Sequence, residues 1–290
     1  MRLLSYVHGG RPGFGALDAS GTGVIDLATR LPDITDLSAL LDAGALDIAR
    51  GIVESATADH PLDDLTSRRT IPRPRKIFCI GVNYGGRNAE YRDSTDGPGK
   101  PSVFVRFPSS LVGHDEALIR PPESEQLDYE GEIVAVVGTG GRRIPRSRAR
   151  SHLAGLTIGN EGTIRDWVRH AKFNVTQGKN WEASGSMGPW LVTMDEIGDL
   201  DDLHLTTTVN GELRQDDTTA SMAFPIDSQI EYLSTFCTLE AGDVIFTGTP
   251  TGAGARFDPP RFLVPGDVVE VHVPPIGTLR NTVADEVIAR

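Results

Sequence analysis

Short apolar runs separated by glycine- and proline-rich turns dominate the chain. Runs of this length, rich in β-branched and aromatic residues, are typical of short β-strands. The clearest hairpin pairs residues 203–209 with 212–215 across an Asn-Gly turn, which supplies the positive φ angles of a two-residue hairpin. The other predicted strands include residues 3–7, 15–17, 23–27, 76–82, 102–106, 133–137, 156–159 and 188–192.

Few segments show the helical period. Residues 226–236 repeat apolar positions at helical spacing, and residues 34–46 place three leucines on one face. The basic segment 147–154 is also expected to be helical. A further helix is expected after Glu161, where Gly162 and Thr163 suit a turn and a helix cap. The pattern as a whole predicts many short strands with a few helices.

The chain divides into two predicted domains, residues 1–70 and 71–290. Residues 67–76 contain two prolines and five basic residues, a stiff and polar composition that is typical of linkers. The first domain carries no pattern of catalytic character, so we expect the chemistry in the second.

Composition narrows the class of protein. The chain has 290 residues, of which 39% are hydrophobic and 23% charged, and its net charge of −12 offers no basic surface for nucleic acid or an anionic membrane. The sequence contains no apolar run of about 18 residues and no signal-peptide pattern, so a cytoplasmic protein is expected. Cys79 and Cys237 lie in apolar surroundings and are expected to be buried thiols.

Two glutamates open one of the apolar runs, in the stretch DYEGE at 128–132. On an extended strand Glu130 and Glu132 lie on the same face, about 6–7 Å apart. Adjacent carboxylates need a cation, a shared proton or solvent. Taken alone, the pair is interpreted as two solvated glutamates on an edge strand, with a metal site as the alternative.

Other polar segments follow predicted strands. Glu161 comes after strand 156–159, and residues 177–181 (QGKNW) are predicted to form a polar loop. The loop TGTPTG at 247–252 offers backbone N–H groups and hydroxyls that could hold an anionic group. Residues 83–100, a turn and short helix followed by a Gly- and Pro-rich loop, are expected to form an active-site lid.

These motifs, in this order, resemble those of the fumarylacetoacetate hydrolase family over residues 76–280. The resemblance implies an α+β, β-rich fold, a mixed β-sandwich roll with peripheral helices, together with a small N-terminal domain and a homodimer. It rests on GVNY at 81–84, LVGH at 111–114, DYEGE at 128–132, RDW at 165–167, GK at 178–179, GPW at 188–190, VNG at 209–211, TGTP at 247–250 and PGDV at 265–268.

The resemblance also implies a metal site. In that family a Glu-x-Glu pair and an acid from an Asn-Asp turn bind one Mg²⁺ or Mn²⁺. The matching residues are Glu130, Glu132 and Glu161, the last in place of the usual Asp. Because all-oxygen ligation suits hard divalent cations, the metal site becomes the preferred interpretation of the glutamate pair.

Further roles follow from the resemblance. Lys179 would place positive charge near a developing enolate oxygen. Thr249 and Gly248 would bind the substrate, and Arg106 would either bind it or form a structural ion pair.

One departure concerns the general base. Hydrolytic members carry an Asn-Tyr-x-x-His-x-x-Glu pattern, in which a His–Glu dyad activates water. Here Arg87 stands in the place of the histidine, and Glu90 matches the glutamate. A guanidinium stays protonated and cannot act as a base, although it could clamp a substrate carboxylate. Glu90 would then act directly, another group would substitute, or the reaction would need no activated water. His114 and His170 are the candidate substitutes, although each is interpreted first as a structural residue.

We therefore expect a divalent-metal enzyme that acts on a small 2-oxo or 1,3-dicarbonyl acid through a stabilised enolate. The family default is C–C bond hydrolysis of an acylpyruvate-type substrate, and Arg87 counts against it. Isomerisation (tautomerisation) or decarboxylation of a hydroxymuconate- or oxaloacetate-like diacid is the alternative. A metal- or ligand-binding relative without catalysis is an alternative of another class.

Overall fold

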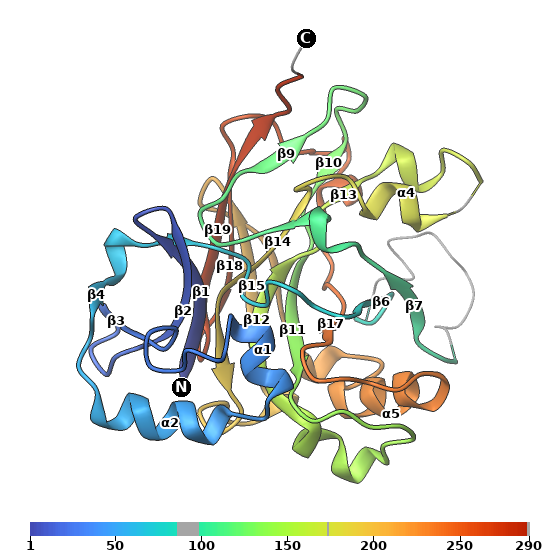
Figure 1. Cartoon of the computed structure of the whole chain (residues 1–290). Coiled ribbons are helices and arrows are strands. Elements are labelled where there is room, and N and C mark those ends of the chain that lie inside the picture. The colour runs from blue at the N-terminus through green and yellow to red at the C-terminus, as the bar shows by residue number, and fades with distance from the viewer. Residues whose placement is uncertain (86–98, 173, 289–290) are drawn as a thin grey trace.

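The computed structural model describes residues 1–85, 99–172 and 174–288, and more of the described residues lie in strands than in helices (Figure 1). The strands of the large sheet are β1 (Arg2–His8), β2 (Arg11–Leu17), β3 (Gly23–Asp26), β4 (His60–Pro61), β5 (Thr66–Ser67), β6 (Ile77–Gly81), β7 (Ser102–Val105), β8 (Leu111–Val112), β11 (Gly131–Val137), β12 (Leu153–Asn160), β14 (Gly185–Thr193) and β17 (Val244–Phe246). A second sheet contains β9 (Leu118–Arg120), β15 (His204–Val209), β16 (Glu212–Thr218), β18 (Val268–Val273) and β19 (Gly277–Asp285). A small third sheet pairs β10 (Leu127–Asp128) with β13 (Thr163–Ile164).

Helices are few and short. The described α-helices are α1 (Leu37–Asp42), α2 (Leu46–Ser55), α4 (Val175–Lys179) and α5 (Ile226–Phe236). The 3-10 helices are η1 (Leu62–Asp64), η2 (Pro108–Ser110), η3 (Arg146–His152), η4 (Asp166–Val168), η5 (Leu200–Asp202), η6 (Thr219–Ser221) and η7 (Gly254–Arg256). The β-rich α+β fold expected from the sequence is confirmed.

The large sheet runs β4-β3-β2-β1-β14-β12-β11-β17-β6-β7, and the second runs β16-β15-β18-β19-β9. Strand β11 lies inside the large sheet and is buried along its whole length. Its side chains alternate between two cores, as the pleat requires. Ile133 and Ala135 pack with the second sheet and α5, whereas Val134 and Val136 pack with β17 and α1. Both faces of β11 are therefore covered.

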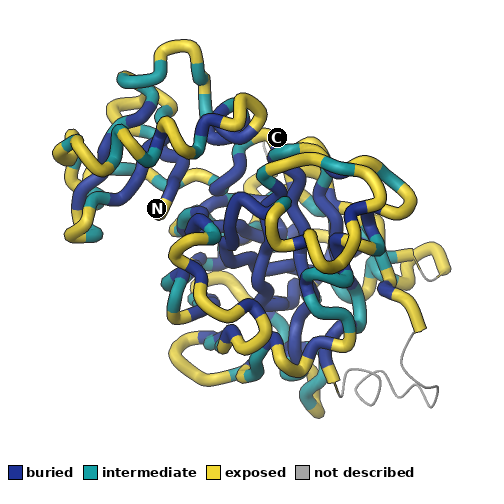
Figure 2. Tube along the Cα trace, turned by 90° about the horizontal axis from the view of Figure 1, so that it is seen from below, coloured by how far each residue is buried: buried dark blue, intermediate teal, exposed yellow. Residues whose placement is uncertain are grey.

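The N-terminal strands extend the large sheet. β1 pairs antiparallel with β14, with Arg2 opposite Val192, and the N-terminal elements form a lobe beside the larger body in Figure 2. Residues 67–76 pack closely, because Thr70 and Ile71 are buried and the Thr70 N–H donates to the Met187 carbonyl at 3.3 Å. The division at residues 70 and 71 stays a prediction.

Most predicted strands and the hairpin are confirmed within four residues at their ends, and the predicted helix 226–236 has the same bounds as α5. Two helix predictions are wrong in extent or type. The predicted helix 34–46 is α1 alone, because the chain turns through Gly44 at a φ of +63°, and α2 was not predicted. The basic segment 147–154 is the 3-10 helix η3, after which residues 153–154 already pair in β12.

Three further predictions need correction. Thr163 does not cap a helix, because it lies in β13 and pairs with Asp128. Lys179 ends α4 instead of lying in a loop, and Asn174 caps that helix by accepting from the Thr176 N–H. Of the two thiols, Cys79 is buried as predicted but Cys237 is only half-buried.

No helix in the described part of the chain is long and apolar enough to cross a membrane. The cytoplasmic location stays a prediction.

Candidate metal centre

Four neighbouring strands of the large sheet have a terminus at the same end of the sheet. Strand β11 begins there and its antiparallel neighbours β12 and β17 end there, with Gly131 opposite Asn160. Strand β6 runs parallel to β17 and ends at the same end of the sheet. The segments at these ends therefore gather the Glu-Gly-Glu stretch, Glu161 and the loop 247–252.

The structure brings the three predicted metal ligands together. One carboxylate oxygen from each of Glu130, Glu132 and Glu161 lies within 4.8 Å of the others, and the three residues are 3%, 1% and 2% exposed. Because β12 and β17 flank β11, the interpretation as a solvated pair on an edge strand is wrong. A buried cluster of acids needs a cation or a shared proton to offset its desolvation.

Lys179 supplies part of that charge from the end of α4. Its Nζ lies 2.9 Å from Glu161 Oε2 and also donates to Glu130 Oε2. The ammonium is buried and lies 5.4 Å from the centre of the Phe104 ring. Burial lowers the pKa of Lys179, but its contacts with Glu130 and Glu161 outweigh this effect and raise the pKa overall.

Arg165 connects Glu130 to a second acid. Its Nη2 donates to Glu130 Oε1 at 2.9 Å, and its Nε donates to Asp128 Oδ2 at 2.7 Å. Asp128 is fully buried and also accepts from the backbone N–H groups of Gly254 and Ala255, at 2.8 and 3.0 Å. Glu130 is thus held by the side chains of Lys179 and Arg165. Asp128 holds the segment that contains Gly254 and Ala255.

Glu132 accepts a backbone hydrogen bond from the loop that follows β17. The Gly248 N–H lies 2.7 Å from Glu132 Oε2. A Cβ on Gly248 would lie 2.7 Å from the Asn83 Cβ, so only glycine allows this approach, and its φ is +106°. Burial raises the pKa of Glu132 well above its usual value, and nearby Glu161 and Glu130 raise it further.

The predicted substrate-binding residues make internal hydrogen bonds. The Gly248 N–H binds Glu132, and Thr249 Oγ1 donates to the Gly131 carbonyl at 2.9 Å. The buried Arg106 donates to neutral oxygens of Ser110, Gly162 and Ser184, and Gly162 is the neighbour of Glu161. These bonds hold Glu132 and the backbone next to Glu130 and Glu161. The substrate-binding roles of the three residues stay predictions.

The donor set fits a hard divalent cation such as Mg²⁺ or Mn²⁺. All three groups are carboxylates, the ligands that such ions prefer. Glu161 Oε1 is buried and has no hydrogen-bond partner among the described residues. When all three acids are ionised, they carry more negative charge than Lys179 and Arg165 can neutralise, because Arg165 also pairs with Asp128. A bound cation would satisfy both the orphaned oxygen and the excess charge.

The lid residues Arg87 and Glu90 lie outside the described residues. Both histidines proposed as substitute bases are described, and their contacts lie elsewhere. His114 Nδ1 accepts from the Arg280 N–H at 3.1 Å, and the exposed His170 ring stacks on Trp167 at 4.0 Å between centroids.

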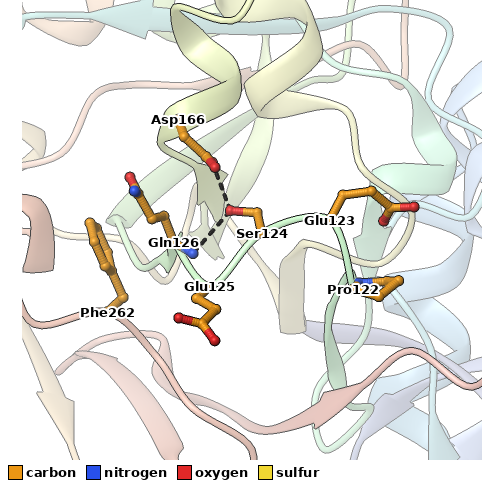
Figure 3. Close-up of a pocket in the computed structure, with 7 residues that line it drawn as sticks. All are labelled: Pro122, Glu123, Ser124, Glu125, Gln126, Asp166 and Phe262. Carbon is orange, nitrogen blue, oxygen red and sulfur yellow. Dashed lines mark hydrogen bonds between the residues drawn. The ribbon is translucent and has the colours of Figure 1, made fainter.

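Figure 3 shows an open pocket of about 400 Å³, and none of the three carboxylates lines it. Within it, Ser124 Oγ donates to Asp166 Oδ1 at 2.7 Å and accepts from the Gln126 N–H at 3.0 Å. Asp166 of the RDW motif therefore anchors the loop between β9 and β10. The pocket is lined by Pro122, Glu123, Ser124, Glu125, Gln126, Asp166 and Phe262.

Sequence reasoning assigned no role to several neighbours of the site. Asp128 and Arg165 lie in the recognised motifs DYEGE and RDW. Their opposite charges could have indicated an ion pair between the two motifs. Gln215 contacts Gly131 from the second sheet, and its place in a hairpin gave no signal. The Cys79 thiol lies near Glu161, and burial together with that acid raises its pKa.

The chain is similar to known proteins. The family model described as "Fumarylacetoacetate (FAA) hydrolase C-terminal" matches residues 76–284. Oxaloacetate tautomerase YisK of Bacillus subtilis is 42% identical over 77% of this chain and 75% of its own length. Mitochondrial oxaloacetate tautomerase FAHD2B of Bos taurus is 34% identical over 98% of this chain and 91% of its own.

A solved structure also matches the whole chain. The fumarylacetoacetate hydrolase (EaFAH) of psychrophilic Exiguobacterium antarcticum has a TM-score of 0.82 and 32% identity, and the match covers 99% of this chain and 100% of that one. The family model alone spans more than half of the present sequence. The chain belongs to the fumarylacetoacetate hydrolase family.

Proposed function

We propose that this chain is a divalent-metal-dependent isomerase that interconverts the keto and enol forms of a small 2-oxo diacid of the oxaloacetate type. The observation that carries the proposal is the buried triad of carboxylates with Lys179 Nζ bonded to Glu130 and Glu161. Two relatives named oxaloacetate tautomerases, which align with at least 77% of this chain, support the choice of reaction.

Glu130, Glu132 and Glu161 would hold the cation, whose charge favours the enolate form of a 2-oxo acid. The Nζ of Lys179 contacts Glu130 and Glu161, and these acids favour its charged form. Its Nζ therefore offers a second positive charge and can exchange a proton at the enolate oxygen, and Glu90, the candidate base from the sequence, would exchange the proton on the neighbouring carbon. The bonds to Glu130 and Glu161 orient Nζ, and burial of the group keeps water out and strengthens each electrostatic contact.

Hydrolysis of an acylpyruvate C–C bond, the default from the sequence, is the second candidate. The name of the Exiguobacterium protein favours it. The Arg87 substitution counts against it, because hydrolysis needs a base that activates water and a guanidinium is not one. Tautomerisation needs proton transfer without activated water, so the altered dyad matters less for that reaction.

The test compares reactions on one sample of purified protein. The enol of oxaloacetate is followed by its ultraviolet absorbance after the addition of metal-free or Mn²⁺-loaded protein. Acylpyruvate cleavage and oxaloacetate decarboxylation are measured in parallel. We expect Mn²⁺-dependent loss of the enol signal, faster than either other reaction; acylpyruvate cleavage as the fastest reaction would overturn the proposal.

Arg87→His separates the two candidates further. If the native reaction is tautomerisation, the new histidine should create or raise hydrolysis. A native hydrolysis that falls in this variant would contradict the base argument. A metal-loaded protein that is inert in all three assays would instead favour a binding protein without catalysis.

A homodimer and a cytoplasmic location remain part of the proposal. Light scattering of the purified chain tests the first, since a dimer has twice the mass of the 31.2 kDa chain. A monomer at working concentrations would contradict it.

A further inference from the structure

Gln215 reaches the Glu-Gly-Glu stretch from the second sheet. It lies on β16, is 1% exposed, and faces the side of β11 opposite to the glutamate carboxylates. The pairing of β15 with β16 shifts at this point, since Thr207 lies opposite Gln215 and Thr208 opposite Leu213. A bulge of this kind re-aims the adjoining side chains, and here a glutamine enters the space between the sheets.

The two ends of the Gln215 amide have separate partners. Its Oε1 accepts from the Gly131 N–H at 2.9 Å. Its Nε2 donates to Thr249 Oγ1 at 2.8 Å and to the Pro250 carbonyl at 3.0 Å. Because a carbonyl accepts only and a backbone N–H donates only, these partners fix the orientation of the amide.

Thr249 closes a ring of hydrogen bonds around Gly131. Its hydroxyl accepts from Gln215 and donates to the Gly131 carbonyl at 2.9 Å. Gly131 is therefore bound at both its N–H and its carbonyl by groups from outside its own strand. This residue joins Glu130 to Glu132, so its orientation fixes where both carboxylates emerge.

The same hydrogen bonds also act on Glu132 through the loop 247–252. Gln215 fixes Thr249 and Pro250, and the preceding Gly248 donates its N–H to Glu132 Oε2. Gly131 has no room to shift towards the second sheet, since a Cβ there would lie 2.1 Å from Thr207 Oγ1. The backbone of the stretch is thus clamped from the face opposite to the carboxylates.

We propose that Gln215 is a positioning residue for the metal site, which sets the relative orientation of Glu130 and Glu132 through Gly131 and Thr249. The inference rests on the proposed role of these glutamates as metal ligands. Gln215 itself touches neither carboxylate, so it acts through the backbone and the loop. Supporting groups of this kind change metal affinity by about 10–100-fold when removed.

The test is Gln215→Met, which keeps the side-chain length and removes all three hydrogen bonds. Asn281→Leu is the matched control. Asn281 is equally buried, donates to the Gly113 and Glu116 carbonyls and accepts from Ser186 Oγ, and so also loses two donated bonds and one accepted bond. For all three proteins, Mn²⁺ affinity is measured by calorimetry without substrate, together with the melting temperature and the split between kcat and KM.

We expect both variants to melt at a lower temperature than the wild type, but only Gln215→Met to bind Mn²⁺ about 10–100-fold more weakly, with a lower kcat. Equal Mn²⁺ affinity in Gln215→Met and the wild type would overturn the inference. Failure of the wild type itself to bind Mn²⁺ would overturn the proposed metal site.

A second variant covers the case in which Gln215→Met does not fold. Gln215→Glu keeps the shape and the acceptor for the Gly131 N–H, and loses both donors. The electron paramagnetic resonance spectrum of its Mn²⁺ complex should differ from that of the wild type, while Asn281→Leu should match the wild type. Identical spectra for Gln215→Glu and the wild type would contradict the positioning role.

Discussion

Lys179 Nζ lies 2.9 Å from Glu161 Oε2, and the same ammonium donates to Glu130 Oε2. A buried cation is thus built into the cluster of carboxylates. A divalent ion in this cluster would lie close to that ammonium, and like charges at short range in a buried site repel each other. We therefore expect Lys179, in its proposed catalytic role, to lower the affinity of the site for metal.

Lys179→Met tests this relationship. We expect the variant to bind Mn²⁺ at least as tightly as the wild type, because the repelling charge is gone. Turnover should fall by about 10²–10⁴-fold, since the variant lacks a proton donor and a positive charge near the enolate. Calorimetry and the enol assay measure the two effects. Lys172→Met, at an exposed lysine, is the control and should change neither the Mn²⁺ affinity nor the turnover. Loss of Mn²⁺ binding together with full turnover in Lys179→Met would contradict the role assigned to Lys179.

Glu161 should tolerate a shorter acid but not a neutral isostere. Glu161→Gln keeps the shape and removes the charge, and should weaken Mn²⁺ binding by at least about 10–100-fold. Glu161→Asp, the residue usual in the family, should keep binding. The affinities of both variants are measured by calorimetry. Unchanged affinity in Glu161→Gln would exclude Glu161 as a ligand.

Gly131 should not accept a side chain. A Cβ there would lie 2.1 Å from Thr207 Oγ1, so Gly131→Ala should lower the free energy of unfolding by about 1–3 kcal/mol. Gly51→Ala is the control, because a Cβ at this exposed position in α2 meets nothing within 4 Å. The control should be neutral or stabilising by up to about 1 kcal/mol. Denaturant unfolding measures both, and equal stability of the two variants would contradict the packing argument.

The ion pair between Arg50 and Asp195 should make stability depend on pH in the acid range. Arg50 Nη1 lies 2.6 Å from Asp195 Oδ2, and this contact lowers the pKa of Asp195 below its usual value. A lowered folded-state pKa adds stability above the unfolded-state pKa of about 4, and that stability is lost as the pH falls further.

Asp195→Asn should therefore be less stable than the wild type at neutral pH, with a small difference because the pair is partly exposed. The difference in unfolding free energy should shrink as the pH falls below about 4. Asp33→Asn, at an exposed acid, is the control. A difference between Asp195→Asn and the wild type that grows at low pH would contradict the sign.

The strands were predictable because their signal is local. The apolar run 133–137 and the hairpin turn at Asn210 appear in the structure much as the sequence indicates. The candidate metal ligands were predicted from ordered motifs and not from local pattern, since Glu130 and Glu132 alone favoured a solvated pair. Burial of that pair depends on β12 and β17, which come from distant segments.

The errors have physical causes. Helix α4 is only one turn long and contains Val175, Thr176 and Gly178, which are poor helix formers, so its sequence resembles a loop. Its position beside Glu161 comes from tertiary packing. The role of Gln215 depends on a bulge and on the approach of two sheets, which no local pattern predicts.

The most direct test of the central claim is a crystal structure with Mn²⁺ and oxalate, an analogue of the enolate of a 2-oxo acid. Anomalous scattering locates the manganese without assumptions about the ligands. We predict one strong peak bounded by Glu130, Glu132 and Glu161, with oxalate beside Lys179 Nζ. Manganese bound elsewhere, with the three carboxylates still joined only by Lys179, would contradict the account.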